Sequence, residues 1–379
     1  MEHGTFAPLN YILMRVISLC GLLILSTLST VSAENPDSVK TKAPSTIVHY
    51  PQEKHLANIK QLTFGGDNAE AYFSFDNSKI TFQATNKKWG DQCDQIYFTE
   101  LATSDMGTNK PSLISTGQGR TTCSYFMPDN KSVVYASTHL TSASCPHVPA
   151  KRPDGKYVWS IYDSFDIFVA DMNGKILKQL TNTPGYDAEP TVSPKGDKIV
   201  FTSLRSGDLE LYTMNIDGSN VKQITFGLGY DGGAFFSPDG SKIVFRASRP
   251  KTDEEVKVYK DLLAEGLVMP TNMELYVCNA DGSDLRQVTN LGQANWAPYF
   301  HPSGKKIIFA SNHKSVSRGL PFNLFMIDID GTNLEQITYD GFFDAFPMFS
   351  FDGKKLIFSS NRNNNGTHDT NLFIADWVD

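Results

Sequence analysis

Short apolar runs separated by tight turns dominate the chain after residue 55. Runs such as 198–201, 242–245 and 306–309 begin with Lys and continue with β-branched and aromatic residues, which favour strands. Each run follows a turn built from Pro, Asp, Ser or Gly, and these residues preset the backbone angles of a hairpin. The pattern predicts antiparallel strands joined by hairpins.

Two sequence markers recur six times along this part of the chain. The first is a Gln-Leu-Thr-like segment, and the second is a Ser-Pro-Asp-Gly-like turn that begins eleven or twelve residues after the Thr of the first. The second markers begin at Ser74, Met127, Ser193, Ser237, His301 and Ser350. A fixed offset of this kind indicates a structural repeat, and each unit reads as four short strands that cannot bury both faces alone.

The repeat predicts an all-β fold, a six-bladed β-propeller of four-stranded antiparallel blades over residues 55–379. The chain ends on the third strand of the last unit, at 372–376, and the segment 59–64 matches the outer strand at 221–226. We expect this N-terminal strand to complete the last blade and so remove an unpaired edge.

The first 54 residues predict export followed by a linker. Arg15 precedes an apolar run from Val16 to Leu28, and small residues before Ala33 suit cleavage, so residues 1–33 read as a signal peptide. The run is shorter than the roughly 20 residues that span a bilayer, and we expect no membrane span in the mature chain. Residues 34–54 are polar and carry three prolines, as linkers do. The expected location is periplasmic or secreted.

Four cysteines follow the expected cleavage site: Cys93, Cys123, Cys145 and Cys278. An exported protein meets an oxidising environment, in which disulfides form. We expect Cys145 to pair with Cys93 or Cys123, and the sequence does not decide between them. Cys278 lies inside an apolar strand and is expected in the core.

Composition and motifs narrow the possible functions. A net charge of −7 disfavours nucleic acid as a partner, and 40% hydrophobic residues disfavour disorder. Residues 227–232 fit the pattern GxGxxG, but they join two antiparallel strands and open no helix, so a dinucleotide site is rejected. Walker A, HExxH and GxSxG motifs are absent. No cofactor is predicted.

Residues that differ between blades for functional reasons are expected on the face that carries the loops between outer and inner strands. A polar residue lies at the position six residues ahead of each turn marker, and its side chain suits hydrogen bonds to nearby loop backbone. These residues are Asn68, Thr121, Asp187, Asp231, Asn295 and Asp344. Two residues further on, at the start of the innermost strands, stand Glu70, Cys123, Glu189, Gly233, Ala297 and Phe346. Two acids near the axis are expected to need a cation, a basic neighbour or water.

The neighbours expected for these acids are the residues that end each second strand: Asn86, His139, Arg205, Arg249, His313 and Arg362. The sequence thus predicts a ligand-binding set at the channel mouth: Glu70, His139, Glu189, Arg205, Asp231, Arg249, His313 and Arg362. The open alternative is a solvated or mutually paired rim. His139 and His313 belong to opposite blades, which disfavours a shared metal, although a divalent metal stays an alternative.

Two insertions enlarge the same face, at residues 139–163 in blade 2 and 249–272 in blade 4. In the second, Val256, Tyr259, Leu262 and Leu263 recur at helical spacing among charged residues, which predicts a short amphipathic helix. The helix could act as a lid or a docking element, or simply pack on its own blade.

The repeated Ser-Pro-Asp-Gly turn and the Ile-Val-Phe strand after it resemble the TolB-type family of periplasmic β-propellers. The resemblance implies a six-bladed propeller in the periplasm. TolB proper carries an α/β domain before its propeller, whereas only 22 residues separate Ala33 from Leu56 here, so that domain is not expected. Similar blades occur in a polysaccharide lyase that acts on oligogalacturonate and uses a propeller-centred metal with His ligands.

The leading hypothesis is therefore an exported, non-catalytic propeller that binds a peptide or an envelope protein on the loop face at the channel mouth. The alternative is a metal-assisted lyase or hydrolase at the same mouth, using Glu70, Glu189, His139 or His313. A third hypothesis, a Tol-system component that binds a peptidoglycan-associated lipoprotein, follows from the resemblance alone.

Overall fold

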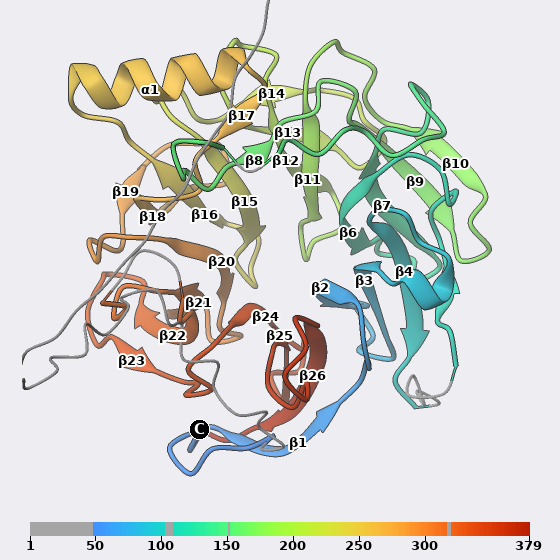
Figure 1. Cartoon of the computed structure of the whole chain (residues 1–379), viewed down its shortest axis with the longest axis vertical. Coiled ribbons are helices and arrows are strands. Elements are labelled where there is room, and N and C mark those ends of the chain that lie inside the picture. Colours follow the sequence, from blue (N-terminus) through green and yellow to red (C-terminus); the bar gives the residue numbers. More distant parts are fainter. Residues whose placement is uncertain (1–47, 103–108, 151, 317–319) are drawn as a thin grey trace, which may run out of the picture. The chain divides into compact units, whose positions relative to one another are not determined.

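Six four-stranded antiparallel sheets follow one another around a central axis (Figure 1). The computed structural model describes residues 48–102, 109–150, 152–316 and 320–379. In five of the sheets the strands run in chain order from the innermost outward, and in the sixth the N-terminal strand takes the outermost place. The structure confirms the predicted six-bladed β-propeller.

The first three blades contain these strands: β2 (Asp67–Phe73), β3 (Lys79–Thr85), β4 (Gln95–Glu100) and β5 (Ser112–Leu113); β6 (Thr121–Phe126), β7 (Ser132–Ser137), β9 (Asp166–Asp171) and β10 (Ile176–Gln179); β11 (Asp187–Val192), β12 (Lys198–Ser203), β13 (Glu210–Asn215) and β14 (Lys222–Gln223). The last three contain β15 (Asp231–Phe236), β16 (Lys242–Ser248), β18 (Met273–Asn279) and β19 (Arg286–Gln287); β20 (Asn295–Phe300), β21 (Lys306–Ser311), β22 (Asn323–Asp328) and β23 (Glu335–Gln336); β24 (Asp344–Phe349), β25 (Lys355–Ser360), β26 (Asn371–Trp377) and β1 (Leu56–Gln61).

The last blade is completed by the N-terminal strand. Strand β1 pairs antiparallel with β26, with Leu56 opposite Trp377 and Gln61 opposite Phe373. This confirms the predicted closure, which covers an edge that would otherwise be free to pair with other chains.

The repeated turn explains why each hairpin forms. In blade 4 the Ser237 hydroxyl donates to Asp239 (2.6 Å), and Asp239 also accepts from the backbone N–H of Ser241 (3.0 Å). Gly240 follows with a φ of +66°, a conformation that glycine adopts without steric penalty. The strand beyond it buries Ile243, Val244 and Phe245 completely.

Four aromatic rings from different innermost strands meet around the axis. The Tyr72 ring lies 5.7 Å from Tyr125 and 5.4 Å from Phe235, and Phe235 lies 5.2 Å from Tyr299. Such ring pairs stabilise a core beyond simple burial. These rings therefore occupy the axis below the loop face, and they limit how far a ligand can enter from that face.

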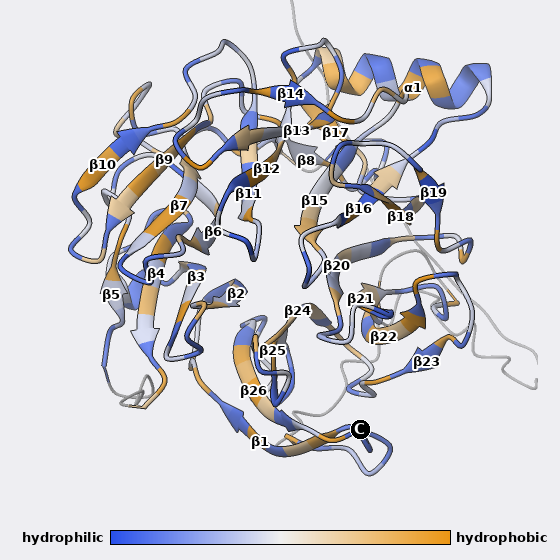
Figure 2. Ribbon diagram, turned by 180° about the vertical axis from the view of Figure 1, so that it is seen from behind, coloured by the Kyte–Doolittle hydropathy of each residue, from blue (hydrophilic) through white to orange (hydrophobic). Residues whose placement is uncertain are grey.

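The insertions of blades 2 and 4 pair with each other. Strand β8 (Trp159–Ser160) lies antiparallel to β17 (Leu267–Val268), and the helix α1 (Asp253–Ala264) precedes β17. This confirms the predicted helix, whose Tyr259 is buried and whose sequence alternates between hydrophilic and hydrophobic residues (Figure 2). A short 3-10 helix, η1 (Lys87–Trp89), lies in blade 1.

The predicted signal peptide, residues 1–33, lies outside the described residues and stays a prediction. Of the predicted linker, residues 48–54 are described, and Glu53 buries its carboxylate against Arg362 (2.9 Å). In the part of the chain that is described, no helix is long and apolar enough to cross a bilayer.

Candidate functional site

Six residues, one from each innermost strand, form a ring at the loop-face end of the axis. Their φ angles lie between 46° and 59°, in the left-handed region, and the strand register shifts there. They are Glu70, Cys123, Glu189, Gly233, Ala297 and Phe346, and all six line a cavity of about 30 Å³, which we call the throat. Left-handed geometry costs a non-glycine residue about 1–2 kcal/mol, and bulges of this kind re-aim side chains next to functional sites.

The Glu189 carboxylate is fully hydrogen-bonded. Its oxygens accept from the Thr202 hydroxyl (2.6 Å), the Tyr230 hydroxyl (2.8 Å), the Gly233 N–H (2.8 Å) and Arg246 Nη2 (2.5 Å). Burial by itself raises the pKa of a carboxyl group, but the Arg246 charge and the hydrogen bonds outweigh it, and the pKa of Glu189 is lowered. Glu189 is thus held as a carboxylate.

Arg246 is the cation of this network, and it is not among the residues predicted from the sequence. Its guanidinium lies 5.4 Å from the centre of the Trp159 ring and 5.1 Å from that of Tyr230, within the range of cation–π attraction. A Cβ on Gly233 would lie 1.7 Å from Arg246 Nη1, so glycine at this position gives the guanidinium its space.

A sequence signal for Arg246 did exist. It occupies the repeat position directly after the aromatic residue of the second strand, where the other blades carry Gln83, Ala136, Thr202, Ala310 and Ser359. Arginine is the one charged residue at this position. In the same blade, Gly233 occupies the repeat position that carries Glu70 and Glu189 in other blades, so the arginine has no acid in its own blade at that position.

Glu70 has the same backbone conformation as Glu189 and a different environment. Its Oε2 has no hydrogen-bond partner among the described residues, and the neighbouring Cys123 thiol only partly offsets the effect of burial on its pKa. Burial is the main reason that the pKa of Glu70 is raised, to about 7, and the charge of Glu189 adds to the effect. Gln83 of the same blade bonds instead to the backbone N–H of Cys123 (3.0 Å).

The three predicted arginines pair elsewhere. Arg205 binds Asp187 (2.9 Å), Arg249 binds Asp231 (2.9 Å between Nη2 and Oδ2), and Arg362 binds Asp344 (3.2 Å) and Glu53. The prediction that these arginines are neighbours of Glu70 and Glu189 is wrong. In each case the aspartate begins one strand of a hairpin and the arginine follows the end of its partner strand, so the shared hairpin brings the charges together.

His139 and His313 are also fixed by their own blades. Nδ1 of each lies 2.9 Å from a serine hydroxyl two residues earlier, Ser137 and Ser311, and burial lowers the pKa of both imidazoles. Neither lines the throat. Among the described residues, no group of three or more His, Cys, Asp or Glu is arranged to hold a metal ion. Of the eight predicted site residues, only Glu70 and Glu189 meet in the throat.

Above the throat lies a larger cavity of about 600 Å³, which we call the central pocket and which shares Glu70, Cys123, Glu189 and Arg246 with the throat. Its lining is rich in aromatic residues: Tyr157, Trp159, Tyr162, Phe165, Tyr186, Tyr230, Trp296, Phe343 and Phe346. Pockets of mostly apolar lining with few polar groups are typical of binding sites.

The blade 2 insertion forms one wall of the central pocket and is attached at two points. A disulfide joins Cys145 of the insertion to Cys93 of blade 1, and β8 pairs with β17. This confirms the prediction that Cys145 forms a disulfide and identifies its partner. Cys123 is a free thiol, and Cys278 is buried as predicted.

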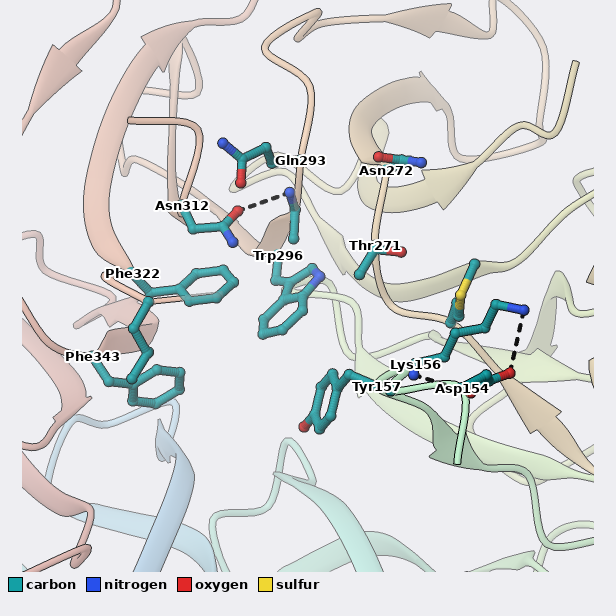
Figure 3. A pocket seen from close by; sticks show the side chains of 14 residues that line it. Asp154, Lys156, Tyr157, Thr271, Asn272, Gln293, Trp296, Asn312, Phe322 and Phe343 are labelled. Atoms are coloured by element: carbon teal, nitrogen blue, oxygen red, sulfur yellow. Dashed lines mark hydrogen bonds and ion pairs between the residues drawn. The ribbon is translucent and has the colours of Figure 1, made fainter. Parts of the chain in front are cut away.

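A second cavity of about 630 Å³, the side pocket, adjoins the first (Figure 3). The rings of Trp296, Phe322 and Phe343 lie on one side, with Trp296 stacked on Phe322 at 4.4 Å, and the Asp154–Lys156 ion pair lies on the other. Tyr157, Trp296 and Phe343 line both cavities. The central and side pockets are therefore adjacent, and we call the two together the groove.

Comparison with known proteins finds similar propellers. Residues 138–267 match the model of the TolB beta propeller domain, and no curated protein matches the chain. The putative TolB from Agrobacterium tumefaciens superposes with a TM-score of 0.53 at 20% identity, over 83% of this chain and 91% of that one. TolB from Acinetobacter baumannii gives a TM-score of 0.47 at 18% identity, over 83% of this chain and 64% of that one.

Oligogalacturonate lyase from Vibrio parahaemolyticus gives a TM-score of 0.48 at 13% identity, over 84% of this chain and 93% of that one. At 20% identity, the match to the Agrobacterium protein shows a shared fold and carries no information about activity. The domain match and the six closed blades agree on one description. The chain is a six-bladed β-propeller, and its residues 138–267 are similar to the TolB beta propeller domain.

Proposed function

We propose that this propeller is exported and binds an extended segment of an envelope protein or peptide in the groove, without catalysing a reaction. The observation that carries the proposal is the groove itself: two cavities of about 600 and 630 Å³ that share Tyr157, Trp296 and Phe343. Two adjacent aromatic-lined cavities suit a chain segment, because Trp and Tyr are enriched among the hot spots of protein interfaces.

Two further observations support the proposal. A TolB-like propeller favours a protein partner, and the Cys93–Cys145 disulfide together with the expected signal peptide favours a periplasmic or secreted location. The free thiol in the throat is a poor nucleophile, because burial raises the pKa of Cys123 well above its usual value.

The metal-assisted lyase or hydrolase is the alternative from the sequence. Among the described residues, no observation favours it, since His139 and His313 bond within their own blades and no acid joins them.

Site-specific photo-crosslinking tests the proposal directly. Benzoylphenylalanine is placed at Tyr157, whose side chain is 60% exposed and lines both pockets. We expect irradiation in intact cells to attach a discrete partner. In pull-downs, the variant Tyr157→Ala should recover about one tenth or less of the amount of that partner that the unmodified protein recovers.

Phe226 provides the matched control, because it is 77% exposed and lines neither pocket. Benzoylphenylalanine at 226 should not give the same adduct, and Phe226→Ala should bind like the unmodified protein. Equal adducts at both positions, or no loss of partner in Tyr157→Ala, would show that the groove is not the binding site.

A further inference from the structure

The charges around the central pocket do not balance. Of the three acids that line it, Glu189 is paired with Arg246 and Asp94 with Arg120. Glu70 is the third, and its Oε2 has no partner among the described residues. An ionised Glu70 therefore leaves one negative charge in a largely apolar, desolvated space, where charges are costly unless they are paired.

The walls around this acid are suited to a cation. The faces of aromatic rings attract positive charge, and the space above Glu70 is lined by rings that include Trp159, Tyr186 and Phe346. Arg246 already uses two of these rings in this way, over Trp159 and Tyr230. Arg246 also acts on Glu70 from a distance, but among the described residues no cation forms an ion pair with Glu70.

We propose that Glu70 receives the ammonium group of a lysine side chain from the bound segment. The inference rests on the proposed function and names the residue that the groove selects. The lysine stem crosses the aromatic central pocket, and the ammonium group donates hydrogen bonds to the Glu70 carboxylate at the throat.

The size of the throat selects lysine over other cations. The throat is small, about 30 Å³, and a lysine ammonium group reaches it on a flexible four-carbon stem, whereas the ammonium group of a chain N-terminus would bring peptide backbone with it. The planar guanidinium of arginine is larger and uses a fork of donors. A divalent metal requires several ligands, and Glu70 has no second acid free to share one.

The test uses the full mature protein and Nα-acetyl-lysine N-methylamide, with binding followed by ligand-observed NMR titration. Three analogues separate the contributions: the norleucine analogue lacks the ammonium group, the Nε-acetyl-lysine analogue neutralises it, and glycine N-methylamide carries an N-terminal ammonium group alone. We expect the lysine compound to bind at least about tenfold more tightly than each of them.

Glu70→Gln removes the charge and keeps the shape, so it should reduce affinity for the lysine compound to that of norleucine. Glu210→Gln is the matched control, because Glu210 is also buried with an unpartnered Oε2 and lines neither pocket. It should leave all four affinities unchanged. Thermal unfolding of each variant confirms that it is folded.

The pH dependence gives a second readout that a structural role would not produce. The groups facing Glu70 are Tyr72, Asp94, Cys123, Glu189 and Arg246. Burial raises the pKa of Tyr72 and of Cys123 well above the usual values, and the pKa of Glu189 is lowered. Lysine affinity should therefore rise as Glu70 loses its proton near pH 7, while norleucine affinity stays constant.

Equal affinity of lysine and norleucine, tighter binding of the glycine compound, or unchanged lysine binding in Glu70→Gln would overturn the proposal. These results leave the groove itself untouched, since the crosslink at Tyr157 reports on it separately. Loss of that crosslink with lysine selectivity retained would instead reject the envelope segment as the source of the lysine.

Discussion

Glu70 and Glu189 occupy the same repeat position in blades 1 and 3 and share the left-handed backbone, with φ of 54° and 59°. Glu189 is an ionised anchor with four hydrogen bonds. Glu70 has an orphaned oxygen and a pKa raised to about 7 by burial. The two residues therefore have the same backbone conformation, but the pKa of one carboxyl group is raised and that of the other is lowered.

The difference comes from the following blade. Beyond Glu189 the next innermost strand supplies Gly233 and the next second strand supplies Arg246. Beyond Glu70 the corresponding positions are Cys123 and Ala136. In this propeller the neighbouring repeat therefore sets the chemistry of a side chain near the axis.

The largest expected effect on stability comes from removing the Arg246 cation. Arg246→Met leaves Glu189 buried without its partner, and we expect a decrease of about 3–5 kcal/mol in the free energy of unfolding, measured by urea denaturation at pH 7. The double variant Glu189→Leu with Arg246→Met removes both charges and should recover most of the loss. A decrease of less than about 1 kcal/mol in the single variant would mean that the two acids differ less than the structure indicates.

A smaller effect is expected from filling the space beside Arg246. In Gly233→Ala the new Cβ would lie 1.7 Å from Arg246 Nη1, so the guanidinium must move away from Glu189. We expect a decrease of about 2–3 kcal/mol in the free energy of unfolding. Gly207→Ala is the control, because Gly207 also has a positive φ but has nothing within 4 Å of its ideal Cβ, and it should cost about 1 kcal/mol. Equal losses in the two variants would attribute the whole effect to backbone strain.

The smallest expected effect is a pH-dependent gain in stability when Glu70 is replaced by Gln. Because burial raises its pKa from 4.5 to about 7, the folded protein holds a proton that the unfolded chain releases between these values. Stability therefore falls as pH rises through this window and stays lower above pH 7. Glu70→Gln should be neutral at pH 4 and should stabilise the protein by about 1–2 kcal/mol at pH 8, a figure reduced for the partial exposure of Glu70.

Glu189→Gln should behave in the opposite way. The pKa of Glu189 is lowered, so its contribution is present above the ordinary carboxyl pKa and is lost only as pH falls through the lowered value. Chemical denaturation at pH 4, 6 and 8 compares the two variants. Parallel pH profiles would contradict the distinction between the two sites.

Repeat features allowed most of the architecture to be predicted. The six turn markers predicted the blades, the match of 59–64 to an outer strand predicted ring closure, and the spacing of Tyr259 and Leu262 predicted α1. The predicted site was less successful, because it placed Arg205, Arg249 and Arg362 beside the central acids, whereas each pairs with an aspartate of its own hairpin.

The sequence by itself determined the fold, the ring of six residues at the throat and the participation of Cys145 in a disulfide. These follow from local turn chemistry, strand periodicity and spacing, which repeat along the chain. Only the tertiary structure decided that Arg246 pairs with Glu189, that Cys93 is the partner of Cys145, and that β8 pairs with β17 beside the groove. It also decided that Glu70 Oε2 has no hydrogen-bond partner among the described residues. The reason is physical: these contacts join different blades, and the side chain that neutralises a buried charge can come from any residue that the ring brings close.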